Sequence, residues 1–148
     1  MRMEKYLIPI NYNQSFKDMV EAGDYKWVNR GITEKNFPIN IKGKVTGKIL
    51  LILVHFNRCM CSDQVLKKFA EHQLQLQPGI LLGLLVFGAE HPDKQRKFPI
   101  VAIGSIWKNQ VPYIGQSSSK NIRGLSLNSR DRNWGKRYRF LATKLVDI

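Results

Sequence analysis

One apolar run constrains the fold of this chain more than any other feature. From Ile49 to Val54 the sequence reads Ile-Leu-Leu-Ile-Leu-Val, without a polar residue. A strand of this kind has both faces covered, because a strand with one face in water alternates polar and apolar side chains. We therefore expect a strand within Lys44–Phe56, at the centre of a sheet and covered on each face.

Shorter apolar segments predict the remaining strands. Tyr6–Tyr12 alternates, and Pro9 within it favours an edge position, because proline cannot donate a backbone hydrogen bond. A longer core strand is expected over Phe98–Trp107. Further short strands are expected at Val111–Ile114, Arg123–Leu127 and Tyr138–Thr143.

Helix caps and periodicity predict three helices. Ser15 caps the first, and Gly23 ends it. Ser62 caps the second, whose apolar residues recur at amphipathic spacing. The third is rich in leucine, follows Gly79 and ends before Pro92. Because strands and helices are segregated instead of alternating, we predict the α+β class: one domain over residues 1–148, with a largely antiparallel sheet and about three helices.

The charge balance restricts the classes of partner. The chain has 24 Lys and Arg against 11 Asp and Glu, a formal net charge of +13. Such a surface attracts nucleic acid, anionic lipid or an acidic protein. We expect no membrane association, because no stretch joins basic residues to a continuous apolar helical face, and no apolar run is long enough to span a bilayer. The alternative is a basic surface that only keeps the chain soluble.

Basic and aromatic residues are interleaved near the C-terminus. Guanidinium and ammonium groups neutralise phosphates, and exposed rings stack on unpaired bases. We therefore predict a non-enzymatic polyanion-binding protein, with low-specificity nucleic-acid binding ranked first and an acidic protein as the other partner. In the alternative interpretation the aromatic rings are core residues and the arginines a solvated outer face. The predicted contact residues are Arg123, Arg130, Arg132, Trp134, Lys136, Arg137 and Arg139. The earlier aromatic residues Tyr25, Trp27 and Phe37 are interpreted as core anchors.

The two cysteines, Cys59 and Cys61, are one residue apart, a spacing that strains a disulfide. We expect reduced thiols in a cytoplasmic protein, since the first residues lack the apolar core of a signal peptide. His55 and His72 lie near them, but Cys-x-Cys is tighter than structural zinc sites use. Cys61 precedes a helix N-terminus, which lowers thiol pKa values, with His55 as a candidate base. A thiol enzyme is therefore a weaker alternative.

A second enzymatic alternative rests on Glu90, His91 and Asp93, since a Glu-His pair suits general acid–base catalysis. A solvated helix end explains the same residues. The chain contains no phosphate-binding glycine loop, dinucleotide fingerprint or nucleophile elbow. We therefore assign no catalytic residue, cofactor or metal.

Several segments resemble an uncharacterised family of small bacterial proteins over most of the chain: Glu21–Asn29, Ile32–Pro38, Phe98–Ser105 and Arg139–Ala142. No activity is assigned to that family, so the resemblance implies no chemistry. The order of elements is also similar to C-type-lectin-like folds, which end in a Trp-containing loop and a terminal strand. That similarity implies an alternative function, an interaction module that grips a protein or small ligand near Trp134. A lectin-type calcium triplet is missing, so it does not imply calcium-dependent sugar binding.

Overall fold

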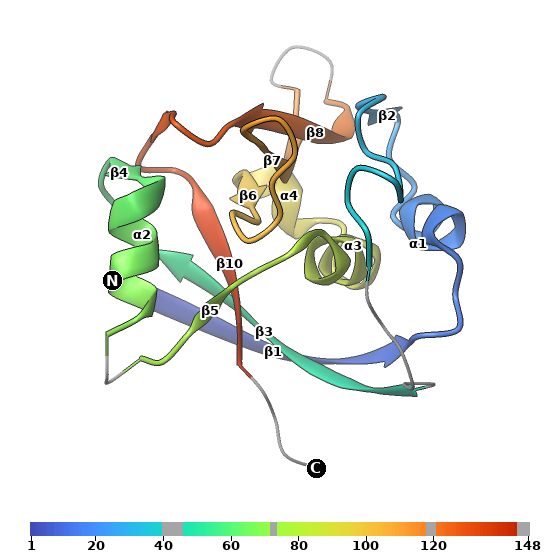
Figure 1. The fold of residues 1–148 in the computed structure, drawn as a ribbon, viewed down its shortest axis with the longest axis horizontal. Helices are drawn as coiled ribbons and strands as arrows, with labels where there is room; N and C mark the ends of the chain where they lie inside the picture. Colours follow the sequence, from blue (N-terminus) through green and yellow to red (C-terminus); the bar gives the residue numbers. More distant parts are fainter. Residues whose placement is uncertain (40–45, 72–73, 118–120, 145–148) are drawn as a thin grey trace.

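The computed structural model describes residues 1–39, 46–71, 74–117 and 121–144 (Figure 1). Within these ranges, seven strands form one continuous path. In spatial order they are β1 (Arg2–Asn11), β3 (Thr46–His55), β10 (Arg139–Lys144), β6 (Ile100–Val101), β7 (Gln110–Gln116), β8 (Arg123–Ser129) and β2 (Trp27–Val28). The eighth strand, β5 (Gln77–Pro78), pairs with β10, and a small second sheet joins β4 (Met60–Cys61) to β9 (Asn133–Trp134).

The α+β class is confirmed, but the sheet is mixed and not largely antiparallel. β6 runs parallel to β10, and β2 runs parallel to β8. Both pairs join segments far apart in sequence, so no hairpin turn fixes their direction. The described residues contain four helices where three were expected. They are α1 (Phe16–Ala22), α2 (Ser62–Phe69), α3 (Leu81–Glu90) and the single turn α4 (Lys94–Lys97).

The apolar run occupies the predicted position. β3 lies between β1 and β10, and Leu51, Ile52, Leu53 and Val54 are each 2% exposed or less. Leu51 and Leu53 enter one hydrophobic cluster, whereas Ile52 and Val54 enter another. Because neighbouring side chains of a strand point to opposite faces, β3 supplies both cores at once.

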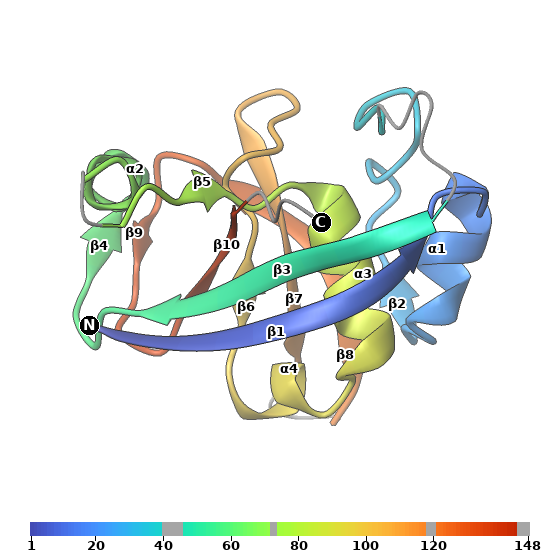
Figure 2. The same cartoon turned by 90° about the horizontal axis from the view of Figure 1, so that it is seen from below.

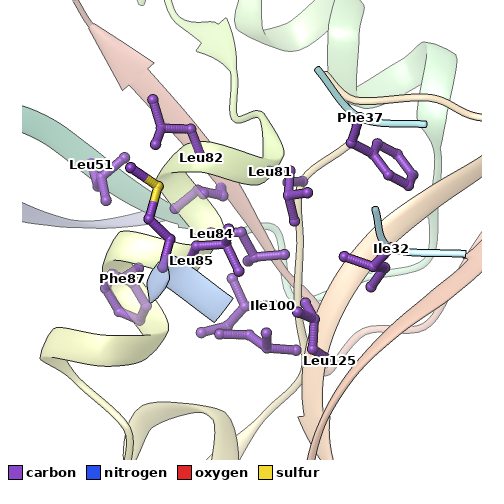
Figure 3. Packing of buried hydrophobic residues seen from close by; sticks show 14 of the residues in the cluster. Ile32, Phe37, Leu51, Leu81, Leu82, Leu84, Leu85, Phe87, Ile100 and Leu125 are labelled. Carbon is purple, nitrogen blue, oxygen red and sulfur yellow. The ribbon is translucent and has the colours of Figure 1, made fainter. Parts of the chain in front are cut away.

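The larger cluster lies inside the curve of the sheet. In Figures 1 and 2, α3 lies between the pair β1–β3 and the pair β7–β8. Figure 3 shows the leucines of α3 among Leu51 of β3, Ile100 of β6 and Leu125 of β8. Gly83 permits the close approach of helix and sheet, since a Cβ there would lie only 3.0 Å from Leu51 Cδ2.

The smaller cluster lies on the opposite face of the sheet. Val65 and Phe69 of α2 pack there with Ile52 of β3, Phe140 of β10 and residues of the β4–β9 sheet. Further along the same face, β7 and β8 present Tyr113, Gly115, Gly124 and Ser126, none of which is fully buried. The packed side chains of α2 and the β4–β9 sheet thus cover only part of this face, and the candidate site lies on the part formed by β7 and β8.

Capping explains where two helices begin. Ser15 Oγ accepts a hydrogen bond from the Asp18 N–H at 3.0 Å, as predicted for α1. The cap of α2 is Cys61, one residue before the expected Ser62. The Ser62 hydroxyl instead donates to the Arg130 carbonyl at 2.7 Å, because this helix end packs against the β9 region.

The strand expected over Phe98–Trp107 is reduced to the two residues of β6. Ala102 and Ile103 remain buried, but the chain then turns toward the start of α3. There the Gly104 N–H donates to the Gly79 carbonyl at 2.8 Å, and Ser105 Oγ accepts from the Leu81 N–H at 2.8 Å. None of the helices in the described ranges is both long and apolar enough to cross a membrane.

Candidate nucleic-acid interface

Arg123 is a structural residue and not the predicted phosphate contact. Its side chain is 6% exposed. Nη1 donates to the Gly23 carbonyl at 2.7 Å, Nη2 donates to Gln95 Oε1 at 2.8 Å, and Nε donates to the Pro92 carbonyl at 3.1 Å. The guanidinium also lies 5.1 Å from the centre of the Tyr25 ring. Because its N–H groups are hydrogen-bonded inside the protein, Arg123 is removed from the set of predicted nucleic-acid contacts.

Trp134 is likewise misassigned, because its ring is 0% exposed. Pairing of β9 with β4, where Trp134 lies opposite Met60, places the indole in the smaller cluster. Its Nε1–H donates to Ser62 Oγ at 3.0 Å, and its ring meets that of Tyr138 edge-on at 5.0 Å. A ring in this position cannot stack on a base or anchor a ligand-gripping loop.

Two other predicted contacts lie beside α2 and β3. Arg130 Nη2 lies 2.7 Å from Asp63 Oδ1, so its charge is already compensated in part by an ion pair. The side chain of Lys136 is exposed, and its carbonyl accepts a hydrogen bond from His55 Nε2 at 2.7 Å. Of the two, Lys136 is the freer cation.

Two of the last three predicted arginines, Arg132 and Arg139, lie over aromatic rings. The Arg132 guanidinium is 5.3 Å from the Tyr138 ring centre, and that of Arg139 is 3.9 Å from the Phe98 ring centre. Arg137 is exposed and donates to the Lys97 carbonyl at 2.9 Å. Stacking of this kind holds a guanidinium in place while its charge stays available.

The pKa of Arg139 is lowered chiefly by burial. Burial lowers that pKa from its ordinary value, and the positive charges of Arg2 and Arg137 lower it further, against the opposing effect of Glu4. Burial also raises the pKa of Tyr138, and the positive charge of Arg132 opposes that rise. Arg2, near the start of the chain, therefore lies close enough to Arg139 to influence it, as does the carboxylate of Glu4.

Arg137 belongs to a pocket of about 400 Å³ that sequence reasoning missed. Arg96 lies in the same lining, where its Nη1 donates to Gln116 Oε1 at 2.8 Å. None of the described residues that line the pocket is acidic, although Asp93 lies 3.8 Å from Arg96 Nε. We call this hollow the arginine pocket. Its lining residues are Gln95, Arg96, Phe98, Pro99, Tyr113, Gly115, Gln116, Arg137 and Tyr138.

A second pocket of about 360 Å³ adjoins the first and shares Tyr113, Gly115 and Gln116 with it. Trp27 forms part of its wall and is 53% exposed, which corrects its interpretation as a core anchor. Tyr25 and Phe37, in contrast, pack in the larger cluster as predicted. We call this hollow the tryptophan pocket. Its lining residues are Trp27, Tyr113, Gly115, Gln116, Ser117, Ile122, Gly124 and Ser126.

Strand register explains both pockets. Gly115 of β7 lies opposite Gly124 of β8, and Gly124 lies beside Trp27 of β2. The alternation Gly124-Leu125-Ser126-Leu127 in the sequence indicates that small residues occupy one face of β8. Gly115 and Gly124 lie on consecutive antiparallel strands, whereas Trp27 reaches Gly124 only through the pairing of β2 with β8, which are far apart in sequence and which no local signal brings together.

The structure places the residues of the two enzymatic alternatives differently. Glu90, His91 and Asp93 line one hollow of about 200 Å³ together with Lys94 and Lys97. Cys59 and Cys61 are free thiols, and the His55 ring is bound to the Lys136 carbonyl. The His91 ring packs against Tyr6, with ring centres 4.8 Å apart. His72 lies outside the described residues, and among those that are described, no three His, Cys, Asp or Glu side chains gather closely enough to hold a metal ion.

The fold and the two pockets define a mixed-sheet α+β protein with an aromatic hollow along β7 and β8 and an arginine-lined hollow beside it. Comparison of the chain with protein-family models, curated proteins and solved structures finds no match. The resemblance to small bacterial proteins and the similarity to C-type-lectin-like folds therefore remain predictions.

Proposed function

We propose that this chain is a non-enzymatic nucleic-acid-binding protein of low sequence specificity, which holds phosphates at the arginine pocket. The observation that carries the proposal is the joint lining of one hollow by Arg96 and Arg137, without an acidic side chain among its described lining residues. Guanidinium groups form strong paired hydrogen bonds with phosphate oxygens. Two of them in one hollow suit successive phosphates of a backbone.

The surroundings of the arginine pocket support the same partner. Arg132 and Arg139 lie over neighbouring rings, and Lys136 is exposed in the same part of the chain. The net charge of +13 adds a long-range attraction for any polyanion. Contacts to phosphates carry no base information, so binding through these residues is independent of sequence.

The test is a titration of labelled single-stranded and duplex DNA and RNA at several salt concentrations. Each neutralised phosphate contributes about −0.7 to the log–log salt slope on single strands, because bound counterions are released. The double variant Arg96→Ala/Arg137→Ala should bind more weakly, with a slope that is shallower by about 1.4. Absence of any binding by the wild type at low salt would contradict the proposal.

A matched control separates a local site from overall charge. Lys5→Ala/Lys17→Ala removes the same number of charges from β1 and α1, and neither residue lines either pocket. We expect this control to keep the wild-type slope. If both double variants lose affinity equally, binding depends on the net charge of the protein and not on the arginine pocket. If polyglutamate binds as tightly as nucleic acid, the partner is an acidic protein instead.

A further inference from the structure

We propose that the tryptophan pocket takes an unpaired nucleobase, which makes the interface selective for single strands. This inference rests on the proposed function, since the phosphates of the same strand would lie in the arginine pocket. It concerns a different set of side chains, however, so the two can fail separately.

The exposed ring of Trp27 and the half-buried ring of Tyr113 flank a floor of backbone. A Cβ built on Gly124 would lie 3.7 Å from Trp27 Cε3, and one built on Gly115 would lie 3.5 Å from Tyr113 Cε2. The tryptophan therefore borders one glycine and the tyrosine borders the other, while the two glycines face each other across β7 and β8. The missing side chains leave room for a flat ring between Trp27 and Tyr113. Stacking on aromatic side chains is how single-strand-binding proteins hold bases without reading them.

The junction of the two pockets indicates a nucleotide and not an apolar side chain or a lipid. Tyr113, Gly115 and Gln116 line both hollows, so a planar group in one is directly connected to an anionic group in the other. Gln116 links them further, because its Oε1 accepts the hydrogen bond from Arg96. A ring joined to a phosphate through a sugar matches this combination of aromatic and cationic walls. In a duplex the bases are stacked and paired, so they cannot enter.

The experiment compares four labelled probes of about 12 nucleotides, a length within the range that such sites cover. They are a DNA single strand, an RNA single strand, a DNA duplex and an abasic DNA strand that has phosphates and sugars only. Trp27→Ala should weaken binding of both single strands by about 5- to 150-fold, the usual effect of one lost stacking contact. Binding of the duplex and the abasic strand should change less than about twofold.

A second variant fills the floor without replacing an aromatic or a charged residue. Cβ atoms at Gly115 and Gly124 would meet their neighbours at ordinary contact distances, so Gly115→Ala/Gly124→Ala should fold. Alanine is also favoured over glycine where the conformation allows it, because it restricts the unfolded chain. We expect this variant to lose single-strand affinity several-fold, while Trp27→Phe keeps most of it. Thermal unfolding of each variant verifies the fold.

Leu7→Ala is the matched control for the loss of an exposed apolar side chain. Leu7 is 54% exposed, close to the value for Trp27, and lies on β1 at the opposite end of the strand order from β2. If the wild type binds the abasic strand as tightly as the two intact single strands, and Trp27→Ala changes none of these affinities, the proposed base pocket is wrong. The proposed phosphate binding would then still stand. If the wild type binds none of the four probes, both proposals are wrong.

Discussion

The hydroxyl of Tyr25 is a buried polar group without a hydrogen-bond partner among the described residues. Burial raises the pKa of this tyrosine to about 12, although the nearby positive charge of Arg123 opposes the rise. Such a group costs about 1–3 kcal/mol to bury. Its ring nevertheless packs in the larger cluster and lies beneath the Arg123 guanidinium. The ring contributes to stability and the hydroxyl opposes it.

We expect Tyr25→Phe to raise the free energy of unfolding at neutral pH by about 1 kcal/mol. A second effect appears at high pH. The unfolded tyrosine ionises near its ordinary value of 10.0, whereas the folded one keeps its proton to about 12. As the pH rises through this window, the wild type should therefore lose stability by about 2–3 kcal/mol more than the variant does. Urea unfolding of the wild type and the variant at pH 8 to 12 measures both effects on the free energy of unfolding. If that free energy changes with pH equally in the two proteins, the raised pKa of Tyr25 is contradicted.

Arg123 and Trp134 show what residue type alone does not establish. Both were predicted to contact nucleic acid, since exposed Arg and Trp do so in many proteins. Arg123 instead satisfies carbonyl groups of Gly23 and Pro92, and Trp134 satisfies Ser62. These partners are distant in sequence, so no local pattern reveals them. Arg137, also a predicted contact, is exposed and lines the arginine pocket, and its contact with nucleic acid stays a prediction.

At the scale of elements, the signals that succeeded are local. The Ser15 cap set the start of α1, and the apolar run in β3 predicted a strand covered on both faces. The sequence did not predict β2, and it predicted β6 to be longer than it is. Each is a two-residue strand that is defined only by the strand it pairs with. The tryptophan pocket depends on β2 lying beside β8. It therefore could not be predicted until the pairing of distant strands was known.

The double role of β3 leads to a prediction about stability. Leu51 is 1% exposed and lies close to Gly83 of α3. Leu51→Ala should lower the free energy of unfolding by about 2–5 kcal/mol, through lost burial and the cavity left behind. Chemical denaturation measures the change. Leu7→Ala on the exposed face of β1 is the comparison and should change stability by less than about 0.5 kcal/mol. Equal effects of the two substitutions would contradict the central position of β3.

The whole molecule carries an excess of like charge. With a net charge of +13, repulsion among basic groups opposes the compact state, and dissolved salt screens that repulsion. Raising NaCl from about 10 mM to about 150 mM should therefore raise Tm by about 2–4 °C, the shift that corresponds to 1 kcal/mol in a protein of this size. Differential scanning calorimetry checks this. A variant with Lys5, Lys17 and Lys35 changed to Gln should show a smaller rise, and a Tm that falls with salt would contradict the argument.

The position of β10 has a consequence for biosynthesis. This strand, built from residues 139–144, lies between β3 and β6 and joins the pair β1–β3 to the strands β6, β7, β8 and β2. A ribosome delivers it last among the described elements, so the two parts of the sheet have no strand between them until residues 139–144 have been synthesised. Long-range pairing of this kind is slow and leaves strand edges unpaired while it waits. We expect the nascent chain to expose the edge of β3, which carries the most apolar run of the sequence, to chaperones until β10 has emerged from the ribosome.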